Sequence, residues 1–132
     1  MKVLAIAGSL REQSYNRGLV RAAQALAPAG MEIIAADISA IPLYNGDEDG
    51  DNRPDSVTAL AEQVKSADAL LFATPEYNYS IPGVLKNAID WLSRVPGGIF
   101  AGKAAAIMGA SMGGMGTSRS QYHLRQVLVF LD

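Results

Sequence analysis

The sequence predicts an α/β fold with a doubly wound parallel sheet. Short apolar runs such as Ala69–Ala73 are typical of strands buried on both faces of a parallel sheet. Segments with apolar residues at helical spacing separate these runs, so strands and helices alternate along the chain. Right-handed crossovers then place helices on both faces. With 132 residues and 49% hydrophobic content, we expect one domain over residues 1–132.

The first half of the chain alternates strand, helix, strand and helix. Lys2–Ala7 and Met31–Ala36 are the expected strands, and Asn16–Ala27 is the helix between them. After a long polar loop, helical spacing marks a second helix through Val57, Leu60, Ala61 and Val64.

The second half continues the alternation. A third strand, Ala69–Thr74, leads through a polar loop into a helix over Pro82–Arg94, with Ser80 as its expected N-cap. One face of this helix is apolar and carries Leu85, Ile89 and Leu92. Ala104–Gly109 is the fourth expected strand, and Ser118–Phe130 is the last expected helix.

Composition excludes several classes of function. The net charge is −2 and the basic residues are scattered, so we expect neither a nucleic acid nor a membrane as partner. Without a membrane span or a signal-peptide pattern, we expect a cytoplasmic protein. There is no cysteine and only one histidine, His123, so we expect no metal site, and any redox chemistry requires a cofactor.

The acidic stretch from Asn45 to Asn52 could be compared with a calcium-binding loop. It lacks the ordered ligand spacing and the closing glutamate of an EF-hand, and no helix precedes it. We therefore expect a solvated loop.

The loop after the first strand contains Ser9, Arg11, Ser14 and Asn16 at the start of a helix. Helix N-termini favour anions, and a guanidinium adds charge and planar donor geometry, so this loop predicts a phosphate site. The pattern matches neither a P-loop nor the dinucleotide-binding turn, which favours a phosphomonoester. Alternatively, Ser14 and Asn16 only cap the helix.

Two further loops contain more aromatic, polar or glycine residues than a simple connection requires. The loop after the third strand holds the stiff Pro75, the flat rings of Tyr77 and Tyr79, and the amide of Asn78, although a rigid turn is an alternative. The loop at 109–118 is glycine-rich, so its backbone can approach a flat ligand closely. Ligands of open α/β sheets bind beyond the carboxyl ends of the strands, where these loops should meet, and FMN in flavodoxin-like folds is the known example.

Three motifs carry a resemblance to a known family. They are Gly8-Ser9-Leu10-Arg11 followed by Ser14 and Asn16, then Pro75-Glu76-Tyr77-Asn78, then Leu85-Lys86-Asn87-Ala88-Ile89-Asp90-Trp91. The chain resembles the NADPH-dependent FMN reductase family, which has a flavodoxin-like fold. Within it, Gln121-Tyr122-His123-Leu124-Arg125-Gln126 favours the quinone and chromate reductase branch.

The resemblance implies the site and the chemistry. The FMN phosphate would be held by Ser9, Arg11, Ser14 and Asn16. The flavin ring would lie against Pro75, Glu76, Tyr77 and Asn78, with Ser111 and Gly114 on its far side, and backbone amides at 76–78 would bind its polar edge. No catalytic side chain is expected: a hydride passes from NADPH or NADH to FMN and on to a quinone, chromate, azo or similar acceptor. Glu76 would act mainly through its main chain, His123 would be structural, and Trp91 would anchor helix packing.

Two other classes of function remain open. A flavodoxin-type electron carrier would keep its flavin and pass single electrons to a protein, although the net charge of −2 is small for a docking face. A non-catalytic module with the same fold would have lost its flavin.

We also expect a homodimer or homotetramer. Trp91, Tyr122, Val129 and Phe130 extend the apolar surface of the helices at 82–94 and 118–130 beyond one stripe, which indicates an interface. The resemblance implies the same arrangement, with the loop at 42–45 reaching the partner's flavin.

Members of the family continue beyond the position of Asp132 with another strand and helix. We therefore expect a sheet in the order 2-1-3-4 without the usual fifth strand and last helix, and with Ala104–Gly109 at its edge. This predicts either a C-terminally truncated form or a chain whose edge is covered by a partner.

Overall fold

A four-stranded parallel sheet in the order β2-β1-β3-β4 forms the centre of the molecule. The computed structural model describes residues 1–131. The strands are β1 (Lys2–Ala7), β2 (Glu32–Ala36), β3 (Ala69–Ala73) and β4 (Ala104–Met108). The helices are α1 (Tyr15–Ala25), α2 (Asp55–Ser66), α3 (Gly83–Leu92) and α4 (Ser118–Val129). The predicted fold class and strand order are confirmed.

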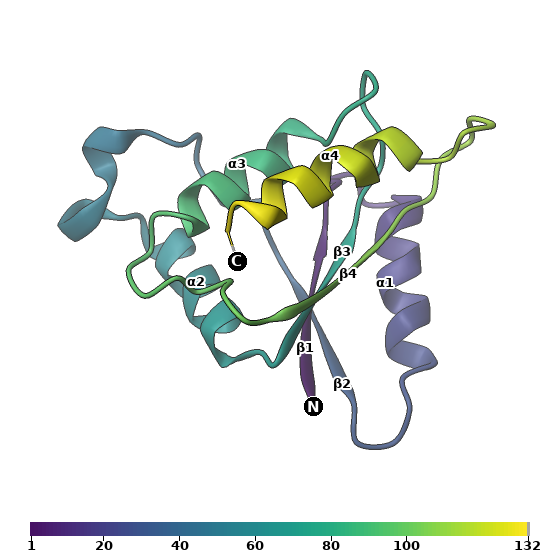
Figure 1. Ribbon diagram of the computed structural model, residues 1–132, viewed down its shortest axis with the longest axis horizontal. Helices are drawn as coiled ribbons and strands as arrows, with labels where there is room; N and C mark the ends of the chain where they lie inside the picture. The colour runs from purple at the N-terminus through teal and green to yellow at the C-terminus, as the bar shows by residue number, and fades with distance from the viewer. Residues whose placement is uncertain (132) are drawn as a thin grey trace.

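The helices cover both faces of the sheet (Figure 1). α1 lies on one side, while α2, α3 and α4 lie on the other. Within residues 1–131, β4 forms one edge of the sheet, as predicted, and Ala104, Ala105 and Ala106 are exposed there.

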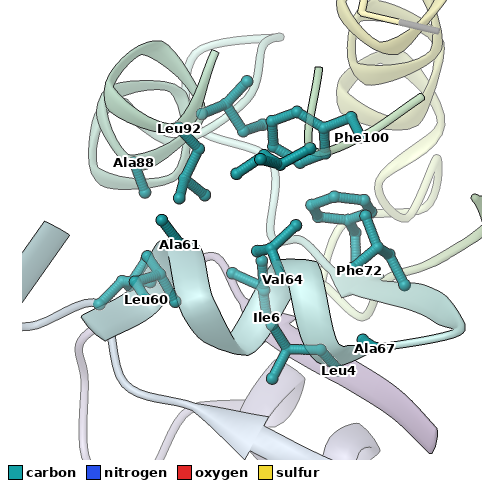
Figure 2. Close-up of a cluster of buried hydrophobic side chains, with 14 of the residues drawn as sticks. Leu4, Ile6, Leu60, Ala61, Val64, Ala67, Phe72, Ala88, Leu92 and Phe100 are labelled. Carbon is teal, nitrogen blue, oxygen red and sulfur yellow. The ribbon is translucent and has the colours of Figure 1, made fainter. Parts of the chain in front are cut away.

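The main core lies between the sheet and α2, α3 and α4. Phe72 of β3 and Ile6 of β1, which are register partners, project into it together with Leu4. Figure 2 shows Leu60 and Val64 of α2 packed against these strand residues. The opposite face has a much smaller cluster, whose buried members are Ala5, Val20 and Ala73.

Some local predictions need correction. Ser80 is not the N-cap of α3: Pro82 occupies that position, without a side-chain cap. Trp91 anchors helix packing as predicted, but it is 0% exposed and therefore adds nothing to the apolar surface. Predicted ends differ from the observed ones by one or two residues, which is usual where terminal turns fray.

The acidic stretch folds locally and lies mostly at the surface. It forms two short 3₁₀ helices, η1 (Gly46–Glu48) and η2 (Gly50–Asn52), with Asn45 and Asp49 as their N-caps. Among residues 1–131, no cluster of three or more His, Asp or Glu side chains is arranged to hold a metal ion. In the same range, no helix has the length and apolar character needed to cross a membrane.

Candidate functional site

Three loops meet at the carboxyl ends of β1, β3 and β4. Backbone hydrogen bonds continue the sheet just beyond the strands, from Gly8 N to the Ala73 carbonyl (2.8 Å) and from Thr74 N to the Met108 carbonyl (2.9 Å). In Figure 1 these loops lie at the upper end of the sheet, next to the N-terminus of α1. The predicted meeting point of the three loops is therefore confirmed.

The loop after β1 presents backbone donors around a turn. Ser14 N donates to the Arg11 carbonyl (3.1 Å), and the Ser14 hydroxyl caps α1 by accepting from Asn16 N and Arg17 N. The exposed Arg11 guanidinium lies 5.3 Å from the centre of the Tyr15 ring. Within residues 1–131, the backbone N–H groups of Glu12, Gln13 and Tyr15 make no hydrogen bond. Such a cluster of unpaired donors at a helix N-terminus is suited to a phosphate.

Ser9 connects this loop to the one that follows β3. Ser9 is 6% exposed, and its hydroxyl lies 3.4 Å from the Tyr77 hydroxyl. The same hydroxyl accepts a long hydrogen bond from Arg11 N (3.4 Å). The predicted phosphate end and the predicted ring end are therefore adjacent.

The loop after β3 folds back as a two-residue hairpin turn. Tyr77 N donates to the Ser80 carbonyl (3.0 Å), and Ser80 N donates to the Tyr77 carbonyl (3.1 Å). Asn78 and Tyr79 between them have φ of 51° and 65°. Asparagine tolerates this left-handed region, whereas such a conformation at tyrosine costs about 1–3 kcal/mol, and strain of this kind gathers at functional sites. The Tyr77 amide is engaged, whereas the backbone N–H groups of Glu76 and Asn78 make no hydrogen bond within residues 1–131 and remain available to a ligand.

The Glu76 side chain points away from this turn and caps α4. Its carboxylate accepts from Arg119 N (2.9 Å) and Ser120 N (3.1 Å), and it lies 3.4 Å from Nη1 of Arg119. The hydrogen bond from Ser120 N, with those from Arg119, holds the pKa of Glu76 below its usual value despite desolvation. The Arg119 guanidinium in turn lies 4.1 Å from the centre of the Tyr79 ring.

The loop after β4 approaches the β3 loop closely at Gly109. A Cβ placed there would collide with the Thr74 carbonyl oxygen and with Oγ1 of Thr117, so only glycine fits. Farther along, Ser111 accepts a hydrogen bond from Gly113 N (3.0 Å), and both Ser111 and Gly114 are exposed. Neither contacts the other predicted site residues through a hydrogen bond in the described part of the chain.

The loop at 42–45 is fastened to α3 by two side chains. Asn87 donates to the Pro42 carbonyl (2.8 Å) and accepts from Tyr44 N (2.8 Å), while the Trp91 indole also donates to the Pro42 carbonyl (2.9 Å). Leu43 is left 84% exposed at the tip. Asn87 and Trp91 both belong to the third motif. Their spacing of about one helical turn is the signal that could have revealed their shared contact with the 42–45 loop.

His123 lies on α4, and its Nδ1 is 3.0 Å from the Ser80 hydroxyl. This contact joins α4 to the end of the hairpin turn. A contact that joins two elements in this way suits the structural role predicted for this histidine.

The chain is similar over its full length to known flavin reductases. A model of the NADPH-dependent FMN reductase family matches residues 1–132. The NAD(P)H-dependent FMN reductase of Pseudomonas aeruginosa is 61% identical, and the quinone reductase of Escherichia coli K12 is 52% identical; each match covers all of this chain and 71% of the relative. The solved structure of the flavoenzyme NAD(P)H:(acceptor) oxidoreductase FerB from Paracoccus denitrificans matches with a TM-score of 0.91 and 40% identity. That match covers 98% of this chain and 71% of FerB.

Proposed function

The chain belongs to the NADPH-dependent FMN reductase family, and we propose that it is a single FMN-binding domain that passes a hydride from NAD(P)H through FMN to a quinone. The observation that carries this proposal is that a loop suited to a phosphate meets a strained aromatic turn at the carboxyl ends of β1 and β3. The quinone acceptor is supported by the 52% identical quinone reductase. Chromate and azo compounds are further candidate acceptors, and the cytoplasm is the proposed location.

The residues present fit the two ends of FMN. At the phosphate end, Ser9, Arg11, Ser14 and the first turn of α1 at Asn16 surround the unpaired N–H groups of the loop. At the ring end, Pro75, Glu76, Tyr77 and Asn78 would supply a rigid wall and two backbone donors. Ser111 and Gly114 would lie on the far side of the ring. When bound, FMN would supply the hydride-accepting and hydride-donating chemistry.

The protein contributes position and electrostatics to this chemistry. Backbone donors at Glu76 and Asn78 would favour negative charge at the polar edge of the ring. The Glu76 carboxylate is occupied at α4, so we assign it no proton transfer. Tyr77 is 50% exposed and Tyr79 67% exposed, which leaves the surface next to the turn open to a second flat molecule.

Reduction under anaerobic conditions tests the proposal. The purified protein, loaded with FMN, should lose its absorbance near the flavin maximum within seconds of adding NADPH or NADH, and regain it when a benzoquinone is added. A flavodoxin-type carrier would bind FMN but would not bleach with NAD(P)H. A non-catalytic module would not bind FMN at all. Either result would overturn the proposal.

We further propose that the protein is a homodimer, or a dimer of dimers, formed through α3 and α4. Tyr122, Val129 and Phe130 of the α4 segment are 62%, 79% and 88% exposed, which supports an apolar contact surface there. In this arrangement the loop at 42–45 would reach the flavin of the partner. Sedimentation at micromolar concentration should give at least a dimer, and a monomer would contradict it.

A further inference from the structure

The Asn16 side chain forms a clamp between two loops of the site. Its Nδ2 donates to the Ala110 carbonyl (3.0 Å), and its Oδ1 accepts from Ala110 N (2.9 Å). The side-chain amide therefore pairs with both polar groups of one residue, as a neighbouring strand would. Asn16 is 2% exposed, so this pairing is shielded from water.

The clamp joins parts that are 94 residues apart in the sequence. Asn16 lies in the first turn of α1, which closes the phosphate loop, whereas Ala110 opens the loop that carries Ser111 and Gly114. From Ser111 to Met115 this loop is exposed; it is rich in glycine, and among residues 1–131 it makes no other hydrogen bond to α1. Among the described residues, the hydrogen bonds that hold this loop to α1 are therefore those of Asn16.

The same geometry restricts rotation of the Asn16 side chain. Oδ1 and one of the two Nδ2 hydrogens are engaged with Ala110, and breaking either bond would leave a buried polar group unpaired. Among residues 1–131, the Arg11 guanidinium makes no hydrogen bond to a distant loop, and it lies over the nearby Tyr15 ring.

We propose that Asn16 is a positioning residue that holds the 110–117 loop against the flavin. This inference rests on the proposed FMN-binding function. It predicts that loss of Asn16 weakens the binding of any molecule that carries the isoalloxazine ring, with or without a phosphate.

Affinities for FMN and riboflavin, measured by quenching of flavin fluorescence, distinguish the two roles because riboflavin lacks the phosphate. Asn16→Ala should lower both affinities by the same factor, roughly tenfold for two lost hydrogen bonds, so that their ratio stays within about twofold of the parent. The control is Arg11→Ala, which should lower the FMN affinity about ten- to a hundredfold and leave riboflavin binding unchanged. Asn16→Ser, which keeps a polar group too short to span the gap, should behave as Asn16→Ala does.

Two results would overturn the inference. If Asn16→Ala weakens FMN alone, Asn16 is a phosphate ligand; if it weakens neither flavin while the protein stays folded, the clamp has no role in binding. By contrast, failure of the parent to bind either flavin would reject the proposed function itself.

Hydrogen exchange of the unaltered, flavin-free protein gives a measurement that needs no variant. The Ala110 amide should exchange at least tenfold more slowly than the Met112 amide, which has no hydrogen-bond partner in the described residues. Equal exchange rates would show that the clamp is open and would overturn the inference.

Discussion

The two faces of the sheet are built from different side chains, although the same strands supply both. Along β3, Leu70 and Phe72 enter the large core under α2, α3 and α4, while Leu71 and Ala73 face α1. The α1 face buries only small or medium side chains, and the other face buries large aliphatic and aromatic ones.

This difference indicates what makes each half of the site rigid, the turn after β3 on one side and the phosphate loop closed by α1 on the other. The turn after β3 connects directly to α3, which is fixed by the large core. α1 closes the phosphate loop but rests on a small apolar contact, so polar bonds beyond the strand ends, such as the Asn16 clamp, contribute a larger share there.

The largest test of the comparison is a matched pair of leucine substitutions. Leu4→Ala removes a side chain that is 1% exposed in the large core and should lower the free energy of unfolding by about 2–5 kcal/mol. Leu71→Ala removes the same atoms from the partly buried α1 face, where about 1–2 kcal/mol is expected because less area is returned to water. Urea unfolding of the flavin-free protein measures both. Equal losses would break the distinction between the faces.

A second test concerns Gly109, where the loop after β4 touches the loop after β3. Gly109→Ala places a methyl group against the Thr74 backbone, which cannot move away easily, so a loss of about 1–3 kcal/mol in the free energy of unfolding is expected. The control is Gly83→Ala in the first turn of α3, where a Cβ meets nothing within 4 Å and no loss is expected. If both variants unfold at the same urea concentration, the close contact between the loops does not hold in solution.

The smallest effect is the pH dependence contributed by Glu76 on the large-core side. Hydrogen bonds from Ser120 N and Arg119 lower the pKa of Glu76 in the folded state, so the stabilisation is present above its ordinary value of 4.5 and is lost as the pH falls through the lowered value. Glu76→Gln should therefore be less stable than the parent at pH 7, and the difference should shrink below about pH 4.5. The measurement is urea unfolding between pH 3 and pH 7.

The control for that series is Glu62→Gln, which removes an exposed carboxylate 2.8 Å from Lys65. A surface pair of this kind contributes about 0–1 kcal/mol, so little change is expected at pH 7. A difference between Glu76→Gln and the parent that stays constant from pH 7 to pH 3 would contradict the role assigned to the carboxylate.

Most of the fold could be predicted from the apolar runs, because a strand buried on both faces must consist almost entirely of apolar residues. Residue types at strand ends also indicated which loops form the site. The Ser80 prediction was wrong because its backbone closes the hairpin turn with Tyr77, and this moved the start of α3 beyond it. Neither the Asn16 clamp nor the Glu76 cap was predictable, since their partners lie 94 and 43 residues away and helix-end polar residues usually act locally.

Trp91 is the single tryptophan of the chain, and it is completely buried while its indole N–H donates to the Pro42 carbonyl. The ring of Tyr44 stands edge-on to it at 4.9 Å. The tryptophan fluorescence of the whole protein therefore originates from one place, beneath the 42–45 loop. Release of that loop would expose the indole to water and shift its emission to longer wavelength, so the molecule carries a built-in optical signal for the attachment of this loop to α3.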